Sequence, residues 1–319
     1  MITVAITGGT GFIGRALVDA HLERGNRVRV LTRRPGSQPA GAMAFAGDLA
    51  SEPPPAFADG ADIVFHLAAE LNDSGRMRDV NARGTERLAE SAAGRCGRWI
   101  QLSSVGVYGP ARQGVETTES TIPKPGNDYE RSKLEADRAV ERICTAAGCP
   151  WGILRPSNVV GATMRNQSAF ALVRAVTGGR FAFIGSPDAI STYVHVDDVV
   201  GALMAIAQAP TGTVANISSD CTWTALVRKI CTRARCREPR LRIPTAAARA
   251  MAGVLGLIRG FPLTRGRIDS LSRLGGYPMG AALQRQGFRL TRPMPEGFDD
   301  VIDRVLLDAA GESRSTRKM

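Results

Sequence analysis

Short apolar segments alternate with amphipathic stretches along the first half of the chain. Residues 2–6 form a mainly apolar run, and a glycine-rich segment follows it directly. Beyond that segment, apolar residues recur at helical spacing from Phe12 to Ala20. This order predicts a strand, a tight turn and a helix.

The same unit recurs further along the chain. Apolar runs predict strands at residues 27–31, 62–67, 98–102 and 151–154, and periodicity predicts helices at 80–93 and 129–147. Apolar strands that alternate with helices predict a parallel sheet covered on both faces. This is a doubly wound α/β fold of the Rossmann type.

The regular alternation of strands and helices ends after Arg155, where proline and glycine interrupt the helical segments. We therefore expect a smaller, mainly C-terminal α/β domain beside the Rossmann domain. The expected boundaries are 1–157 and 191–218 for the Rossmann domain, 158–190 and 219–310 for the second domain, and 311–319 for a flexible polar tail.

The composition is that of a folded protein. Of the 319 residues, 44% are hydrophobic and 22% are charged, which excludes a disordered chain, collagen and a coiled-coil rod. Pro210 and Gly212 interrupt the longest uncharged run, 199–219, so we do not expect it to span a membrane. No basic region precedes the first apolar run, so we expect no signal peptide and a cytoplasmic location.

The excess of positive charge lies in one region. Residues 221–292 hold fifteen arginine or lysine residues and two acidic ones, Glu238 and Asp269, whereas the whole chain has a formal net charge of +11. The region is either a basic groove for an anionic ligand or the product of a bias toward arginine. Aromatic residues do not interleave the basic ones as in a platform for single strands, so we expect no binding of nucleic acid.

Cysteine and histidine are too few and too scattered to indicate a metal centre. The six cysteines include no CxxC pair, and the chain has three histidines. Neither a zinc site nor a disulfide framework is favoured. We expect reduced, mainly structural thiols.

The glycine-rich segment after the first strand places Gly8, Gly11 and Gly14 in GxxGxxG spacing. Glycine permits a tight turn and a close approach of the backbone to a pyrophosphate. The helix that follows offers free N–H groups and the positive end of its dipole. The segment therefore predicts a dinucleotide site that also includes Phe12 and Ile13.

The end of the second predicted strand determines which nicotinamide cofactor fits. NAD-selective sites place a carboxylate there to bind the ribose 2′-hydroxyl, whereas this chain has Arg33 and Arg34. Either guanidinium can form charge-assisted bonds to a 2′-phosphate, so NADP is favoured over NAD. A third strand is expected before residue 47, and we expect Asp48 and Leu49, which follow it, to border the adenine.

The pair Tyr129 and Lys133 lies four residues apart on a predicted helix and therefore on one face. A protonated lysine beside a phenol lowers its pKa from about 10, so we expect Tyr129 to act as a general acid or base. The same ammonium is expected to hold the nicotinamide ribose. Ser104 ends the preceding strand, where its hydroxyl is expected to polarise a substrate carbonyl.

These motifs resemble those of the extended short-chain dehydrogenase/reductases, also called the NAD-dependent epimerase/dehydratase family. The similar segments are TGGTGFIG, GDL at 47–49, FHLAA at 65–69, VNARGT at 80–85, LSSVGVYG, YERSK at 129–133, LRPSNVVG at 154–161 and YVHVDD at 193–198. The resemblance covers nearly the whole chain and implies a catalytic triad of Ser104, Tyr129 and Lys133. It also implies a substrate-binding second domain and a homodimer joined through the helices that contain residues 80–93 and 129–147.

The resemblance further implies which residues contact the ligands. The cofactor contacts, to which we add Ser103, are those of Gly8, Gly11, Gly14, Ala68, Asn81 and Pro156. The expected substrate contacts are those of Asn158, Arg265 and Arg267.

Two departures from the family pattern narrow the activity. The 4,6-dehydratases follow the catalytic position with an Asp-Glu pair, whereas Val105 and Gly106 follow Ser104. Dehydration is therefore not expected. Sugar-nucleotide epimerases typically carry an arginine before the YxHVxD strand, where this chain has Ser191 and Thr192. Binding of a sugar nucleotide then depends on Arg265 and Arg267.

The sequence thus predicts an NADP-dependent reductase or dehydrogenase that acts on a ketone or a keto-sugar nucleotide. The alternative is a nucleotide-sugar C4 epimerase with tightly bound NAD, which uses the same triad. A non-catalytic dinucleotide sensor is disfavoured because Tyr129 and Lys133 are both present. His195 is expected to support the domain junction, and the apolar segment 246–258 to pack within its own domain rather than on a membrane surface.

Overall fold

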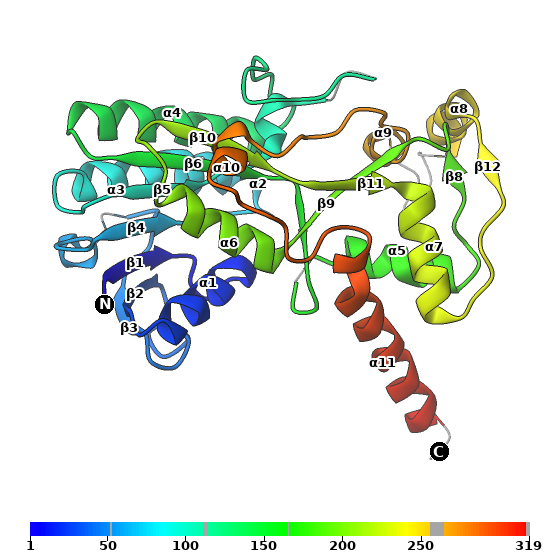
Figure 1. Cartoon of the computed structure of the whole chain (residues 1–319), viewed down its shortest axis with the longest axis horizontal. Coiled ribbons are helices and arrows are strands. Elements are labelled where there is room, and N and C mark those ends of the chain that lie inside the picture. Colours follow the sequence, from blue (N-terminus) through cyan, green and yellow to red (C-terminus); the bar gives the residue numbers. More distant parts are fainter. Residues whose placement is uncertain (52, 111–113, 165, 256–264, 317–319) are drawn as a thin grey trace.

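A seven-stranded sheet forms the centre of the larger domain in this computed structural model, which describes residues 1–51, 53–110, 114–164, 166–255 and 265–316 (Figure 1). The order is β10-β6-β5-β4-β1-β2-β3, and neighbouring strands run parallel. The strands are β1 (Thr3–Thr7), β2 (Arg27–Thr32), β3 (Met43–Ala46), β4 (Ile63–His66), β5 (Trp99–Leu102), β6 (Trp151–Pro156) and β10 (Thr213–Ile217). The doubly wound fold predicted from the sequence is confirmed. Its order reverses between β1 and β4, where such folds bind ligands at the carboxyl ends of the strands.

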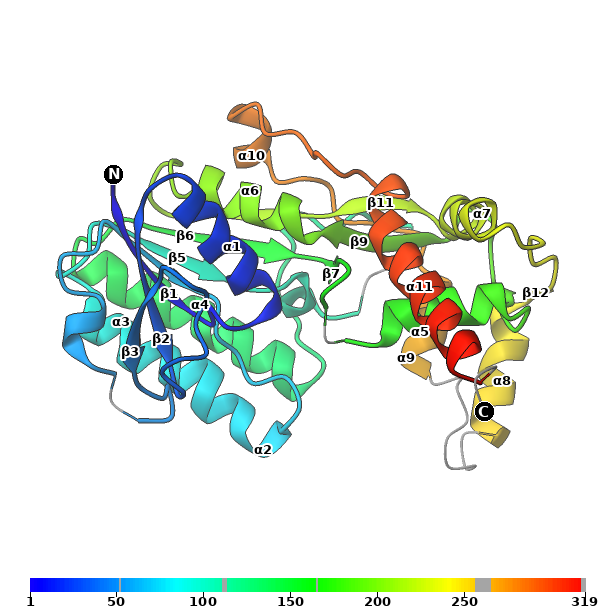
Figure 2. The ribbon, with the colours of Figure 1, turned by 90° about the horizontal axis from the view of Figure 1, so that it is seen from below.

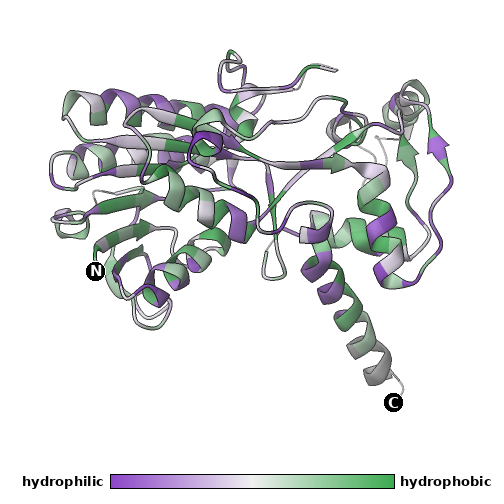
Figure 3. Ribbon diagram, viewed as in Figure 1, coloured by the Kyte–Doolittle hydropathy of each residue, from purple (hydrophilic) through white to green (hydrophobic). Residues whose placement is uncertain are grey.

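Helices cover both faces of this sheet, as Figure 2 shows. One layer contains α1 (Phe12–Glu23), α6 (Val196–Ile206) and α10 (Ala281–Arg285), and the other contains α3 (Gly84–Ala92) and α4 (Asp128–Ala146). Side chains of alternate residues in β1 point into opposite layers. Val4 and Ile6 pack with α1 and α6, whereas Ala5 packs with α3 and α4. Burial on both faces explains why the strands are almost continuously apolar, as Figure 3 shows for β1 and β4.

The helical segment before β5 begins earlier than the sequence predicts. The Asp73 side chain caps α2 (Ser74–Met77) by accepting a hydrogen bond from Gly75 N at 3.0 Å. A π-helical stretch, η2 (Arg78–Arg83), then leads into α3. The remaining short turns are the 3-10 helices η1 (Pro55–Phe57), η3 (Val105–Tyr108) and η4 (Glu296–Phe298).

The remaining strands form a small sheet of order β11-β9-β7 and a two-stranded sheet of β12 and β8, and these sheets with their helices are here called the second domain. The strands are β7 (Asn158–Val160), β8 (Phe183–Ile184), β9 (Ile190–His195), β11 (Ser219–Thr222) and β12 (Arg242–Ile243). The helices are α5 (Ser168–Thr177), α7 (Trp223–Ala234), α8 (Thr245–Leu255), α9 (Arg265–Leu271) and α11 (Asp299–Thr316). Their core includes Phe170, Trp223, Leu226 and Phe298, which are buried between α5, α7 and α11.

The two domains meet at the carboxyl ends of the large sheet. β6 ends at Pro156 and leads into β7, and β10 ends at Ile217 and leads into β11. In the second domain, Ala248 and Ala252 of α8 pack with Ile184 and Ile268, in line with an apolar segment that packs within its own domain.

The last helix extends further than the sequence predicts. Residues 311–316 of the expected tail continue α11 as helix. No helix in the described part of the chain combines the length and the apolar character that crossing a membrane requires.

Candidate active site

The glycine-rich turn joins β1 to α1. Gly8 has a φ of +70°, and its carbonyl oxygen accepts a hydrogen bond from Gly11 N at 2.8 Å. A Cβ on Gly8 would lie 2.8 Å from the Ala68 nitrogen, and a Cβ on Gly14 would lie 2.7 Å from the Gly8 carbonyl carbon. Gly11 caps α1 without a side-chain hydrogen bond, so the first N–H groups of the helix are open to an anion. The turn therefore fits a pyrophosphate.

The other residues predicted near this turn differ in exposure. Phe12 and Ile13 are partly buried in the first turn of α1. The Asp48 carboxylate accepts a hydrogen bond from Ala50 N at 3.0 Å, and Leu49 is buried in the core beneath α3. Pro156 is buried at the end of β6.

Arg33 and Arg34 follow β2 and are both exposed. Among the described residues, neither guanidinium forms a hydrogen bond or an ion pair. Both cations are therefore available to a phosphate beside the carboxyl end of β2.

A buried chain of hydrogen bonds that the sequence did not indicate links β1 to η2. The Thr85 hydroxyl donates its single proton to the Asn81 carbonyl oxygen at 2.5 Å. Thr85 Oγ1 therefore accepts a hydrogen bond from His66 Nε2, which lies 2.8 Å away. His66 Nδ1 then accepts from Thr7 Oγ1 at 2.7 Å. Burial, reinforced by the charge of Lys133, lowers the pKa of His66 to about 3, so the ring is neutral and its tautomer follows from these partners. A histidine inside the apolar FHLAA run is the signal that could have indicated this chain.

Asn81, predicted to contact the cofactor, lies within η2 and is buried. Its amide oxygen accepts from Glu70 N at 2.6 Å, and its Nδ2 donates to the Glu70 carbonyl oxygen and to Ser132 Oγ, each at 3.0 Å. Asn81 therefore fixes the segment after β4 against α4.

The predicted triad lies where the end of β5 meets the start of α4. Ser104 Oγ caps η3 by accepting from Gly106 N at 3.0 Å. A Cβ on Gly106 would lie 3.0 Å from Glu130 Cγ, so the first turn of α4, which carries Tyr129, lies against η3. Lys133 is buried, and its Nζ donates to the Leu102 carbonyl oxygen at 2.5 Å.

The titration of the triad differs from the sequence-based expectation. Burial raises the pKa of Tyr129 to about 12, with further contributions from the Asp137 and Glu130 carboxylates. Burial lowers the pKa of Lys133 to about 8, although the Asp137 carboxylate acts in the opposite direction. The expectation that the lysine lowers the phenol pKa is therefore wrong for this structure, because desolvation of the phenol outweighs any such effect.

A buried ion pair that the sequence did not indicate lies behind the triad. Asp137 Oδ2 accepts hydrogen bonds from Arg155 Nη2 at 3.0 Å and from Ser103 Oγ at 2.8 Å. Arg155 Nη1 also donates to Tyr108 Oη at 2.9 Å. Burial raises the pKa of Asp137, opposed by the charges of Arg155 and Lys133. Ser103, predicted to contact the cofactor, thus binds this carboxylate.

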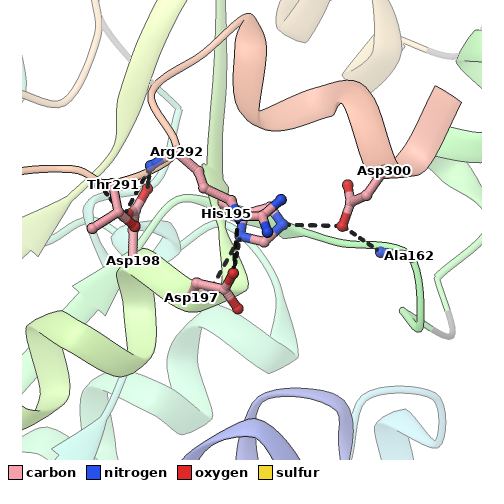
Figure 4. Close-up of polar contacts among 7 residues, drawn as sticks. All are labelled: Ala162, His195, Asp197, Asp198, Thr291, Arg292 and Asp300. Carbon is pink, nitrogen blue, oxygen red and sulfur yellow. Dashed lines mark hydrogen bonds and ion pairs between the residues drawn. The ribbon is translucent and has the colours of Figure 1, made fainter. Parts of the chain in front are cut away.

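His195 ends β9 and contacts Asp197 and Asp300, as Figure 4 shows. Its Nε2 lies 3.1 Å from Asp300 Oδ2, and its Nδ1 accepts from Asp197 N at 3.2 Å. Nearby, Asp198 Oδ1 accepts from Thr291 N at 2.6 Å. These contacts connect α6 to α11 and to the segment before it, in line with the expected supporting role of His195.

The predicted substrate residues lie on two separate elements, β7 and α9. Asn158 starts β7, and its Nδ2 donates to the Thr192 carbonyl oxygen at 3.1 Å. Arg267 is exposed on α9, a helix that packs on α8, β8 and β9. The backbone of Arg265 starts α9, but its side chain lies outside the described residues.

Several basic side chains of the arginine-rich region pair with acids from outside it. Lys229 Nζ lies 3.1 Å from Asp299 Oδ2, and Arg233 Nη2 lies 2.6 Å from Asp303 Oδ2. Arg292 also forms an ion pair with Asp197, whose carboxylate lies 3.0 Å from Arg292 Nε. These pairs neutralise part of the positive charge, which weakens the interpretation of the region as an anion-binding groove.

Comparison with known proteins identifies related sequences and a related fold. The sequence pattern of the NAD dependent epimerase/dehydratase family matches residues 4–218. A dTDP-6-deoxy-L-talose 4-dehydrogenase (NAD(P)(+)) of Kitasatospora kifunensis is 35% identical over 182 residues, which are 54% of this chain and 57% of that protein. Sterol demethylase protein B of Methylococcus capsulatus is 34% identical over 214 residues, which are 60% of this chain and 64% of that protein. The alignments therefore span about three fifths of these relatives.

Among solved structures, the chain is similar to UDP-glucose 4-epimerase of Thermotoga maritima, determined with UDP-glucose. The TM-score is 0.73 at 20% identity, and the superposition covers 97% of this chain and 100% of that one. At this identity the likeness establishes the fold.

Proposed function

The chain belongs to the NAD dependent epimerase/dehydratase family, and on that premise we propose that it is an NAD(P)-dependent oxidoreductase that reduces a substrate ketone. The proposal rests on the close approach of two segments, the residues after β5, which include Ser104, and the start of α4. Gly106 lies against the first turn of α4, which carries Tyr129. Lys133, one turn further along α4, donates a hydrogen bond to the Leu102 carbonyl oxygen. Ser104 follows the carboxyl end of β5, at the same edge of the sheet as the glycine-rich turn after β1, where a doubly wound fold binds a dinucleotide.

In the proposed reaction, each residue of the triad acts on the substrate oxygen or supports a group that does. A bound nicotinamide supplies the hydride. The Tyr129 hydroxyl donates a proton to the carbonyl oxygen as it gains negative charge, and the Ser104 hydroxyl orients that oxygen. Lys133, held by the Leu102 carbonyl, supplies positive charge beneath the site.

The protonation state of Tyr129 suits the role of proton donor. With a pKa of about 12, the phenol is protonated at neutral pH and is ready to donate a proton. A nucleotide-sugar C4 epimerase with tightly bound NAD, the alternative, must first remove a proton from a hydroxyl, which requires a phenolate. Nicotinamide cofactor that co-purifies with the protein and can be identified by mass spectrometry would support that alternative.

We propose NADP as the preferred cofactor, because Arg33 and Arg34 are exposed after β2 and their guanidinium groups pair with none of the described residues. NADPH is expected to bind more tightly than NADH, and Arg33→Ala or Arg34→Ala to remove most of the preference. One charge-assisted contact of about 1.5 to 3 kcal/mol corresponds to roughly 10- to 150-fold in affinity. Fluorescence titration with both cofactors measures the ratio.

Arg95→Ala is the control for this titration, because Arg95 is exposed in the turn before β5 at the opposite end of the sheet. It should leave both affinities unchanged. Equal affinity of the unmodified protein for NADPH and NADH would refute the assignment of NADP.

For the substrate we propose a ketone that lacks a diphosphate. Ser191 is buried and donates from Oγ to the Cys221 carbonyl oxygen at 3.0 Å, so it supplies no cation where sugar-nucleotide epimerases carry an arginine. Free UDP and dTDP are therefore expected to bind with Kd above about 1 mM in calorimetry with NADP(H) present, equivalent to less than about 4 kcal/mol.

Arg267→Ala distinguishes the two substrate classes. If UDP or dTDP binds at micromolar concentration and Arg267→Ala weakens it, the substrate is a sugar nucleotide and the ketone proposal is wrong. Because NADPH titration is measured separately, this result would leave the oxidoreductase assignment intact.

We also propose a homodimer and a cytoplasmic location. The dimer is inferred from family resemblance and would use the layer formed by α3 and α4, which lies on the side of the sheet away from α1 and α6 (Figure 2).

A further inference from the structure

Three of the six cysteines, here called the thiol cluster, meet at the end of the large sheet opposite the candidate active site. Cys96 lies in the turn before β5, Cys144 near the end of α4, and Cys149 just before β6. The Cys96 and Cys149 sulfur atoms are 3.8 Å apart, and Cys149 N donates to the Cys144 carbonyl oxygen at 2.9 Å. Trp99 N donates to the Pro150 carbonyl oxygen at 2.8 Å, which holds the two strand starts together.

The surroundings of Cys149 favour its thiolate. Hydrogen bonds with the Cys144 and Cys96 thiols lower the pKa of Cys149, burial opposes them, and the charge of Arg98 acts in the same direction as the hydrogen bonds. The same hydrogen bonds, together with burial, raise the pKa values of Cys96 and Cys144. Cys149 is thus the one thiol of the cluster whose pKa is lowered, and the thiolate is the form that reacts with oxidants.

The thiol cluster is suited to covalent chemistry rather than to binding a metal ion. Across the described residues, no group of three or more His, Cys, Asp or Glu side chains is arranged to hold a metal. Cys96 is partly exposed, whereas Cys149 is 5% exposed, so a small oxidant has a route to the pair from the side of Cys96.

We propose that the thiol cluster is an oxidation site at which a peroxide joins Cys149 to Cys96 through a disulfide. The Cys149 thiolate attacks one oxygen of hydrogen peroxide, the O–O bond breaks, and a sulfenic acid and hydroxide form. The Cys96 sulfur then attacks the Cys149 sulfur, and the S–O bond breaks. The departing oxygen leaves as water with the Cys96 proton. The two thiols lose two electrons and two protons in total, and the peroxide becomes two molecules of water.

Cys96 is the partner of Cys149 because the two sulfur atoms already lie within 3.8 Å of each other. It lies in a turn outside regular secondary structure, so the sulfur atoms can move from 3.8 Å to a disulfide bond length of about 2.05 Å. Cys144 is held within α4 and is fully buried, which restricts its movement.

The disulfide should leave catalysis unchanged, since it lies far from the triad. α4 has 19 residues, which at 1.5 Å per residue gives a helix of about 28 Å. Tyr129 lies in its first turn and Cys144 in its last. The link closes a loop between cysteines 53 positions apart, so the thermal midpoint of the oxidised protein should rise.

The test is peptide mapping of the reduced full-length protein after treatment with hydrogen peroxide. Free thiols are blocked with N-ethylmaleimide, and the protein is digested with trypsin without reduction. Peptide 96–98 is expected to be joined to the peptide that begins at residue 143 and contains both Cys144 and Cys149. Cys144→Ser should keep this link and Cys149→Ser should abolish it.

Cys221→Ser is the matched control, because Cys221 is a partly exposed thiol in the second domain whose sulfur contacts Ser191 Oγ at 3.2 Å. It should leave the link intact. A loss of two hydrogens within the peptide from residue 143 would show a Cys144–Cys149 disulfide and overturn the proposed pairing. Peroxide that modifies Cys221 as fast as Cys149, with no linked peptide from the unmodified protein, would overturn the site itself.

Discussion

Tyr129→Phe is expected to reduce turnover by about 10²- to 10⁴-fold while it leaves cofactor affinity within a few-fold. The phenol is the proposed proton donor, with a pKa of about 12. Its hydroxyl forms no hydrogen bond to the described residues, so its removal should disturb neither the fold nor the cofactor site. Single-turnover rates with NADPH, cofactor titration and thermal unfolding measure the three properties separately.

Tyr193→Phe is the matched control, because Tyr193 is another tyrosine whose pKa burial raises to about 12. It packs on Trp223 and Phe298 in the second domain. Its replacement should retain most of the turnover. If Tyr129→Phe instead retains more than about a tenth of the rate, another residue donates the proton and the triad assignment is wrong.

Asp137→Asn is expected to lower the free energy of unfolding by about 3 to 5 kcal/mol, because it leaves the buried Arg155 without its carboxylate. It should also lower the pKa of Lys133 below its present value of about 8, since Asp137 is the charge that raises it. If turnover needs a protonated lysine, the alkaline limb of the rate profile moves to lower pH. Denaturant unfolding and kcat against pH test the two effects.

The pH dependence of stability follows from the same shift. In the folded chain the pKa of Lys133, about 8, lies below its ordinary value of 10.5. Burial of this lysine therefore costs stability below pH 8, and the cost disappears as the pH rises to 10.5. In Asp137→Asn, the rise in stability should begin at a lower pH.

Glu135→Gln is the control on the same helix. Its carboxylate pairs with Arg78 at 3.0 Å on the surface, where such pairs contribute about 0 to 1 kcal/mol. It should change neither stability nor the alkaline limb to a comparable extent. If Asp137→Asn loses the expected stability but the alkaline limb of kcat against pH does not move, Asp137 has only a structural role.

The fold and the positions of the main motifs could be predicted from the sequence because the signals are local. A run of apolar residues between turns defines a strand wherever both faces of a sheet are covered, as in β1 and β5. Glycine at position 8 is required by its own φ of +70°. The spacing of Tyr129 and Lys133 places both on one face of any helix that includes them.

The tertiary structure decided the surroundings of these motifs, since those depend on residues far apart in the chain. His66 is neutral because it is buried and near the charge of Lys133, and its partners Thr7 and Thr85 come from two other elements. The pairing of Asp137 with Arg155 requires α4 to pack on β6. The sequence around Tyr129 indicated a lysine neighbour and hence a lower pKa, whereas burial raises that pKa. Desolvation is set by the whole packed environment, which no local pattern of residues encodes.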